Sequence, residues 1–450
     1  MSFVPPRIAP PAKPLTGLAF VAQFVRNPIA VVPQAAYEGD LATYERGRRA
    51  IVWITAPALI KQVLLDEREN FLKLAQIRLL SPLLGKGVLT SEGADWKWQR
   101  QASAPMFRPQ ELAGFVPTFV RAAECVIERW RAQPAAVQPV DRAMSEATFE
   151  VISATLLPSG DERMPQAIER STALLQRSGA WGQFYAIANL PRWLPQPGRR
   201  SMASAVRALR AAVGALIAER RAHPGTKDDL LHRLMQARDP ESGQSMNDEQ
   251  LVDNLLTFYL AGHETTAKAL TWTLYLLACS PGWTRALEEE IARVTGGAEV
   301  NAGHIEQLML TQQVLKEAMR LYPPVPLMTR QAVADTQLGE SKVRAGTSVV
   351  LPIYAIHRHA KRWADADAFD PARFAPEKEA AIPRYQYMPF GAGPRICIGM
   401  GFAMMEATAM LATLLRRARF APVAGREPAP VARVTLIPGG GMPLAVRLRS

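Results

Sequence analysis

Apolar residues recur at helical spacing along most of this 450-residue chain, whereas the alternating pattern of strands is confined to short segments. Between Pro109 and about Ala222 the pattern is helical almost throughout, with breaks at "LPSGDERMP" and "NLPRWLPQPG". From Leu41 to Thr55 the apolar positions alternate around a turn at Gly47, which predicts a hairpin. The pattern as a whole predicts a mainly α protein with small β-sheets.

The longest predicted helix begins at Asn247 and ends before Pro281. Asn247 can cap this helix, and Gln250 three residues later nearly completes a capping box. A helix of roughly 32 residues extends about 48 Å, far enough to cross a whole domain. Because its flanks are charged and its centre holds polar residues, we do not expect it to span a membrane.

Two segments near the C-terminus have strand-like patterns. Residues 343–356, "VRAGTSVVLPIYAI", read as a strand, and residues 431–449, "VARVTLIPGGGMPLAVRLR", predict a hairpin that turns at Gly439–Gly441. Since strands are expected from both ends of the chain, we expect residues 31–450 to form one interleaved domain. Residues 1–30 are rich in proline and are expected to form an irregular arm on the surface.

The composition is that of a large folded protein in a reducing compartment. Hydrophobic residues make up 48% of the chain, and its three scattered cysteines do not form a disulfide framework. The longest apolar run near the N-terminus, Gly17–Val25, has about 9 residues, against the roughly 20 that span a bilayer. We therefore expect a monomeric cytoplasmic protein without a membrane anchor.

The net charge of +12 could suit nucleic acid, an anionic membrane or an acidic protein partner. The chain has no zinc-finger spacing and no long Lys/Arg block, and its basic residues are mostly arginines scattered among the predicted helices. Nucleic-acid binding is therefore not expected. A solvated arginine-rich surface and a docking face for an acidic protein both fit the charge.

The residues around Cys397 are the most specific feature of the chain. Cys397 lies just before a predicted helix, whose N–H groups and dipole favour a thiolate. Gly391, Gly393, Gly399 and Gly401 would let the backbone wrap closely around a sulfur and a flat cofactor. Neither the Cys/His set of a structural zinc site nor the C-x-x-C-H of c-type haem attachment is present. Taken alone, the cysteine also fits a buried core residue beside a loop.

Residues 390–399 contain the full pattern F-x-x-G-x-R-x-C-x-G, carried by Phe390, Gly393, Arg395, Cys397 and Gly399, which resembles the haem-thiolate signature of the cytochrome P450 family. The resemblance implies the cytochrome P450 fold, with the long central helix over the haem and the cysteine loop beneath it. It makes Cys397 the proximal ligand of haem b, iron protoporphyrin IX, through a thiolate that favours O–O cleavage. It also places Arg395 on a haem propionate, Phe390 over the sulfur, and Gly391 and Gly399 against the cofactor.

The stretch "AGHETT", residues 261–266, lies in the middle of the long helix and puts an acid and an alcohol side by side. A mid-helix threonine can bond back to a preceding carbonyl and loosen the turn. The stretch is similar to the family motif A/G-G-x-D/E-T-T, which lines a groove for dioxygen beside the haem. By this resemblance Thr265 donates a hydrogen bond during dioxygen activation, Glu264 helps to relay protons through water, and Ala261 faces the cofactor and substrate. His263, at the variable position, is expected to be a solvated or core histidine.

Two further motifs occur in the family's order. Glu317 and Arg320, three residues apart on one helix face, match E-x-x-R, and Arg373 in "FDPARF" is the third member of that family network. The resemblance assigns these three to folding and haem retention. Trp96 and Arg100 match W-x-x-x-R, whose donors suit a haem propionate, and Arg330 is similar to another propionate ligand.

The resemblance implies a monooxygenase that inserts one oxygen atom from O2 into a hydrophobic small molecule. Since only about 50 residues follow Cys397 and none of the motifs belongs to a reductase, electrons are expected from a separate ferredoxin or flavodoxin with its reductase. The substrate pocket is expected to involve the segment before Trp96, the region around Trp181 and Phe184, and Thr257, Ala261, Leu327 and Met328. Alternatives are a peroxygenase or haem-dependent isomerase, which the acid–alcohol pair disfavours, and a non-enzymatic haem sensor or carrier.

Overall fold

The computed structural model describes residues 3–46, 49–156, 181–188, 190–191, 194–195, 199–223, 229–239 and 241–449. The turn expected at Gly47 and the break at "LPSGDERMP" lie outside these residues. The described helices are α1 (Gly17–Arg26), α2 (Ala35–Glu38), α3 (Pro57–Lys61), α4 (Leu74–Leu84), α5 (Gly93–Ser103), α6 (Pro109–Leu112), α7 (Val116–Ala132), α8 (Val140–Leu156), α10 (Arg199–Ala222), α11 (Leu230–Gln236), α12 (Asp248–Ala278), α13 (Pro281–Thr295), α14 (Ala302–Ile305), α15 (Met309–Leu321), α16 (Ile353–Ile356), α17 (Pro376–Ala380) and α18 (Met400–Arg417).

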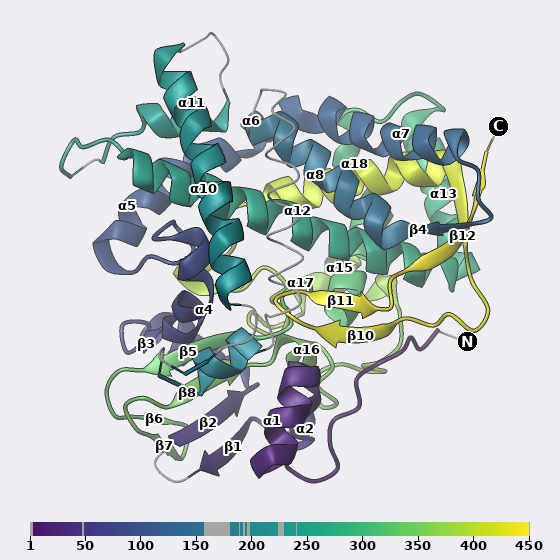
Figure 1. Ribbon diagram of the computed structural model, residues 1–450. Coiled ribbons are helices and arrows are strands. Elements are labelled where there is room, and N and C mark those ends of the chain that lie inside the picture. The colour runs from purple at the N-terminus through teal and green to yellow at the C-terminus, as the bar shows by residue number, and fades with distance from the viewer. Residues whose placement is uncertain are drawn as a thin grey trace.

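The described strands form small separate sheets, and Figure 1 shows the helices gathered at one side of the largest of them. That sheet has the order β1-β2-β8-β5-β3, the others β10-β11, β4-β12-β9 and β6-β7. Their bounds are β1 (Leu41–Arg46), β2 (Arg49–Ile54), β3 (Phe71–Leu72), β4 (Val137–Pro139), β5 (Met328–Ala332), β6 (Thr336–Leu338), β7 (Ser341–Val343), β8 (Ser348–Leu351), β9 (Ala418–Pro422), β10 (Ala429–Ala432), β11 (Leu436–Gly439) and β12 (Pro443–Leu448). The prediction of a mainly α fold with small sheets is confirmed.

Helix α12 forms the axis of the molecule. It has 31 residues, and Asn247 and Gln250 complete the capping box expected from the sequence, with Asn247 Oδ1 accepting from the Gln250 N–H at 2.9 Å. Its sides pack against α8, α10, α15 and α18, so most of its residues are buried all round. The central residues that stay accessible, Leu260–Gly262 and Thr265, line an internal cavity.

The structure confirms one predicted hairpin and corrects two other strand predictions. Strands β1 and β2 pair antiparallel, as expected. The strand expected over residues 343–356 stops at Leu351, because Pro352 ends β8 and the next four residues turn as α16. The prediction of a C-terminal hairpin is wrong. Strand β11 pairs with β10, whereas β12 pairs with β4 and β9. Gly440 and Gly441, both at positive φ, separate β11 from β12.

The N-terminal arm is irregular from Phe3 to Thr16 and helical in α1. Its irregular part is bonded to the body of the protein. The Tyr322 hydroxyl donates to the Pro6 carbonyl at 2.6 Å, and the Ile8 N–H donates to the Tyr354 hydroxyl at 3.0 Å. The arm therefore lies against α15 and α16 and covers part of the buried network described below.

Candidate active site

A cavity of about 430 Å³ lies between α12 and the loop that carries Cys397. Segments from residue 73 to residue 435 contribute to its lining, which is mostly apolar. Most of the residues expected from the sequence to bind cofactor, act in catalysis or contact substrate line this one cavity: Trp96, Arg100, Thr257, Ala261, Glu264, Thr265, Leu327, Met328, Arg330, Phe390, Gly391, Arg395, Cys397 and Gly399. Of the region around Trp181 and Phe184, it is Gln183, Ala186 and Ile187 that line the cavity.

The cysteine loop is a tight turn closed by backbone hydrogen bonds. The Cys397 N–H donates to the Phe390 carbonyl at 2.9 Å. Gly391 and Gly393 have φ of +71° and +70°, where other residues are strained, and a Cβ at Gly393 would lie 2.6 Å from the Leu64 carbonyl oxygen. Gly399 has a negative φ and instead caps α18. Two of the glycines are thus required by the turn itself.

The Cys397 thiol is accessible from the cavity, although the surrounding protein encloses it. Burial raises the pKa of the Cys397 thiol, while the Gly399 N–H and the charge of Arg100 act in the opposite direction. The helix start and Arg100 therefore favour the thiolate, and an electrophilic metal bound to the sulfur would complete the deprotonation.

Cationic side chains gather at one end of the cavity. The Arg395 guanidinium lies 3.8 Å from the Trp96 ring centroid, donates to the Ser91 carbonyl at 3.0 Å and pairs with Glu92. Arg330 is buried, and burial lowers its pKa to about 10. Since Glu92 is the carboxylate that faces both Arg395 and Arg330, this end of the cavity carries a net positive charge.

Lys73 and Glu92 belong to this cluster and were missed by the sequence motifs. Lys73 is buried, its Nζ donates to the Leu89 carbonyl at 2.5 Å, and its N–H donates to Glu92 at 3.3 Å. Burial, together with the charges of Arg395 and Arg330, lowers the pKa of Lys73 to about 7. The signal available in the sequence was a single lysine inside the apolar run "FLKLAQ".

Glu264 and Thr265 lie on adjacent positions of α12, at the edge of the cavity. The Thr265 hydroxyl donates to the Ala261 carbonyl at 2.7 Å, as a mid-helix threonine is expected to do. Glu264 is buried and accepts a hydrogen bond from the Thr435 hydroxyl at 3.2 Å. His263 is a core residue, with Nδ1 2.9 Å from the Tyr259 carbonyl oxygen.

Glycine at position 262 allows α8 to pass close to α12. A Cβ at Gly262 would lie 2.7 Å from Cδ1 of Ile152 on α8. Because Gly262 also lines the cavity, the absence of a side chain serves both the helix packing and the free space beside Thr265.

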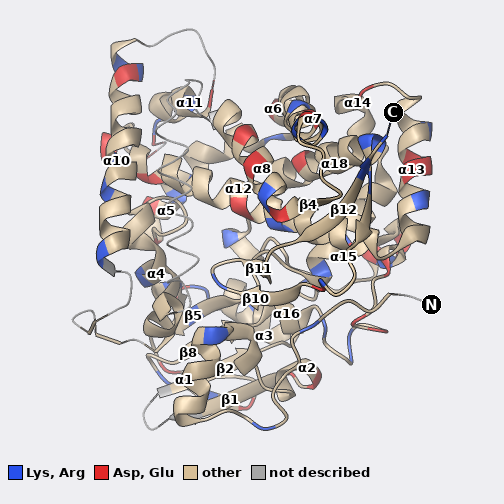
Figure 2. Cartoon of the chain, turned by 45° about the vertical axis from the view of Figure 1, so that its right-hand side comes forward, with Lys and Arg blue, Asp and Glu red and all other residues tan. Residues whose placement is uncertain are grey.

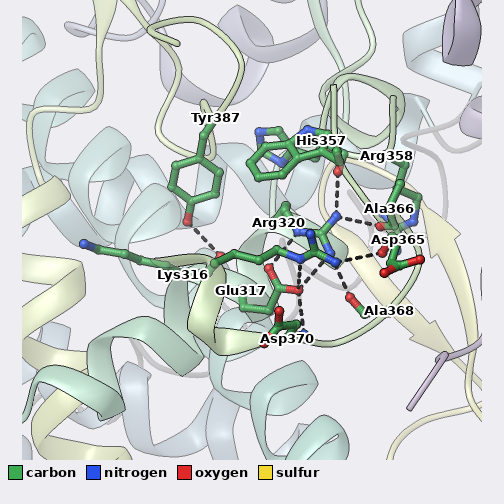
Figure 3. A network of polar contacts seen from close by, with 12 residues as sticks. Lys316, Glu317, Arg320, His357, Arg358, Asp365, Ala366, Ala368, Asp370 and Tyr387 are labelled. Carbon is green, nitrogen blue, oxygen red and sulfur yellow. Dashed lines mark hydrogen bonds and ion pairs between the residues drawn. The ribbon is translucent and has the colours of Figure 1, made fainter. Parts of the chain in front are cut away.

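Glu317, Arg320 and Arg373 meet outside the cavity in the buried network of Figure 3. Glu317 and Arg320 are 0% exposed. The Arg320 guanidinium binds both oxygens of Glu317, at 2.7 and 2.8 Å, and also donates to the carbonyls of His357, Ala366 and Ala368. Its full set of donors is therefore satisfied, and Arg373 lies 3.5 Å from Glu317.

His357 links this network to the cysteine loop. Its carbonyl accepts from Arg320 at 2.8 Å, and its Nε2 accepts from the Met388 N–H at 2.8 Å, two residues before Phe390. Tyr387 stacks on the imidazole and donates its hydroxyl to the Lys316 carbonyl at 2.8 Å. The segment that enters the cysteine loop is thus bonded to α15 and to the chain after α16.

Comparison with known proteins agrees with this geometry. The family model described as cytochrome P450 matches residues 8–442. The chain belongs to the cytochrome P450 family. It is 32% identical to cyclooctatin synthase of Streptomyces melanosporofaciens, over 96% of this chain and 94% of the relative. It is 30% identical to cyclooctat-9-en-7-ol 5-monooxygenase of the same organism, over 93% and 90%. It is 29% identical to pentalenene oxygenase of Streptomyces avermitilis, over 95% and 94%.

The protein is thus a cytochrome P450 monooxygenase, an oxidoreductase that uses a haem iron. The residues of the cavity fit that group. Cys397 supplies a sulfur ligand, and the cations around Glu92 suit the two carboxylates of a porphyrin. The buried Ser91 hydroxyl, beside Arg395, has no hydrogen-bond partner within the described part of the chain and could donate to such a carboxylate.

Proposed function

We propose that the P450 binds haem b between α12 and the cysteine loop. Cys397 would hold the iron, Phe390 would cover the sulfur, and Gly391, Gly399 and Ala261 would allow the porphyrin close to the backbone. Arg395, Arg330, Arg100 and Trp96 would bind the propionates. The cationic cluster, with only Glu92 to balance it, is the observation that carries this proposal.

The network of Glu317, Arg320 and Arg373 would act in folding and haem retention and not in the chemistry. The network is joined to the cysteine loop through His357, whose carbonyl accepts from Arg320 and whose Nε2 accepts from the Met388 N–H. Because His357 bonds the entrance of that loop, a change in the network would be transmitted to Cys397 as a loss of position.

The residues of α12 would supply protons to the oxygen site. When bound, the haem iron supplies the activation of dioxygen and the insertion of one oxygen atom into the substrate. Thr265 can turn its hydroxyl from the Ala261 carbonyl toward the cavity, where it would donate a hydrogen bond. Glu264, beside it, would take up protons from the solvent side and pass them on through water.

The substrate would be a hydrophobic cyclic hydrocarbon or alcohol. The lining above Thr265 is apolar, with leucines of α4 and residues Phe107, Ile152, Phe258 and Val434, and polar side chains are few. Thr257, Leu327 and Met328 would contact the substrate. Two relatives carry the names of cyclooctat-9-en-7-ol and pentalenene, a cyclic alkenol and a cyclic alkene by name, and both chemistries suit such a lining.

Electrons would come from a separate protein, an acidic ferredoxin or a flavodoxin with its reductase, and the net charge of +12 suits an acidic partner. Figure 2 shows Lys and Arg spread over many helices and interspersed with Asp and Glu. No role in nucleic-acid binding is proposed.

We propose a monomeric cytoplasmic protein without a membrane anchor, in which residues 31–450 form one catalytic domain after the arm of residues 1–30. Among the described residues, Arg200–Ala222 of α10 has the length and composition of a membrane span, with a third of its most apolar window buried inside the fold.

A spectroscopic experiment tests the proposal. The purified protein, reduced and treated with carbon monoxide, should show the strongly red-shifted Soret band of thiolate ligation. Cyclic alkenes and alkenols should then shift the oxidised protein from low to high spin as they displace water at the iron. Absence of the thiolate band in fresh protein that contains haem would refute the ligand assignment, and linear fatty acids binding better than cyclic compounds would refute the substrate class.

A further inference from the structure

A buried lysine lies one turn after the acid–alcohol pair of α12. Lys268 is 8% exposed, and from Thr265 to Ala278 it is the one charged residue of the helix. Burying an ammonium is costly unless it is paired. Its Nζ lies 3.5 Å from Oε1 of Glu264 and 3.3 Å from Oγ of Ser145 on α8.

These contacts join Glu264 to the outer side of α8. Ser145 is half-buried and donates in turn to the Asp141 carbonyl at 2.9 Å, so the polar contacts run from α12 toward the surface. The same oxygen of Glu264 accepts from Thr435. Thr265, the next residue, bonds to its own helix. The acid and the alcohol are thus held by different partners.

We propose that Lys268 is a positioning residue for Glu264: anchored by its contact with Ser145, it holds the Glu264 carboxyl group in place at the edge of the cavity. This inference rests on the proposed role of Glu264 in proton supply. It does not require Lys268 to touch substrate or cofactor.

The charges around Glu264 give the proposal its physical content. An ammonium within about 4 Å attracts a carboxylate, and removing one partner of a buried pair leaves the other without its counter-charge. His263 Nε2 lies 4.0 Å from Oε2, but burial lowers the pKa of His263, so this ring adds no charge near neutral pH. On α18, Glu406 faces Thr266, and burial raises its pKa to about 8, which leaves it neutral below that pH.

The test compares Lys268→Met, which is similar in length but uncharged, with Lys268→Arg, which keeps the charge. Lys316→Met is the matched control, because it removes a partly buried lysine from its ion pair with Glu379 on a different helix. Product formed per electron is measured with a substrate found in the binding screen, both with Glu264 present and in a Glu264→Gln background. Hydrogen peroxide formed per electron is measured in parallel.

Lys268→Met should lower the product per electron severalfold and raise the peroxide per electron, whereas Lys268→Arg and Lys316→Met should match the wild type. The effect should vanish when Glu264 is already glutamine, because the two residues act as one unit. A merely structural lysine would change haem content and thermal stability alike in both backgrounds.

An unchanged product yield per electron in Lys268→Met would overturn the proposal. If that variant does not fold, Lys268→Gln is measured in its place, with the same expected loss. A wild-type protein that shows the thiolate band but forms no product would count against the proposed function instead. Peroxide formed per electron, compared between Lys268→Met and Lys268→Arg, then still decides the role of Lys268.

Discussion

Replacing His357 with glutamine tests how the buried network supports the cysteine loop. The imidazole is wholly buried, stacks on Tyr387 at a centroid distance of 5.2 Å, and accepts from the Met388 N–H. Burial, with the charges of Arg320 and Arg358, lowers the pKa of His357 from 6.5 to about 3. The folded protein therefore keeps His357 neutral across the whole physiological range.

The magnitude follows from the difference between the folded and unfolded chains. Below pH 6.5 the unfolded chain takes up a proton at this residue, and the folded protein does so only near pH 3. The free energy of unfolding therefore falls by about 1.4 kcal/mol for each pH unit in that window and stays unaffected above it. From pH 6.5 to 4.5 the loss due to this residue is roughly 2 kcal/mol.

His357→Gln keeps an acceptor for the Met388 N–H but does not titrate. Urea denaturation of both purified proteins, followed by circular dichroism and the Soret band, should show a shallower loss of stability in the variant below about pH 6.5. His223→Gln, at the exposed end of α10, should behave as the wild type. Parallel curves for the wild type and His357→Gln would refute the reasoning, because the other titrating groups are the same in both.

Three further substitutions test separate parts of the site. Thr265→Ala should leave the thiolate band intact and divert electrons from product to hydrogen peroxide, measured as product per electron; an unchanged yield would rule out its role in proton supply. Arg320→Lys should leave buried acceptors unpaired, lower the free energy of unfolding by about 3–5 kcal/mol and reduce haem retention, measured by denaturation and haem transfer. Gly85 and Gly93 both have φ of +58°, but a Cβ at Gly85 would overlap the Asp253 carboxylate whereas one at Gly93 has open space. Gly85→Ala should therefore destabilise the protein by about 1–3 kcal/mol more than Gly93→Ala, and equal melting temperatures would contradict this.

The sequence predicts the cavity well because its residues belong to motifs with fixed spacing. The loop around Cys397 and the "AGHETT" turn are each local structures, so the arrangement of residues within each one is set by near neighbours in the chain. That the two face one cavity was implied by the family resemblance. The capping box of α12 is predictable for the same reason. These features depend on hydrogen bonds and backbone angles of residues close in sequence, and such residues can be read from the sequence.

The sequence does not predict which strands pair, or which charged residues are buried, when the partners are distant along the chain. The alternation of residues 431–449 is real, but nothing local shows that β12 pairs with β4 and β9 and not with β11. Lys73 and Lys268 look like ordinary surface lysines in the sequence, and only the fold shows that both are buried beside a carboxylate. Burial of a charge depends on what packs over it, and that is a property of the tertiary structure.

The order of segments around the cavity sets when the site can form during synthesis. Its lining begins at Lys73 and ends at Thr435, the Trp272 ring donates to the Leu436 carbonyl at 3.0 Å, and β12 at the end of the chain pairs with β4. Residues up to Leu436 must therefore be synthesised before the cavity can close, and the apolar lining that earlier segments supply stays open until they are.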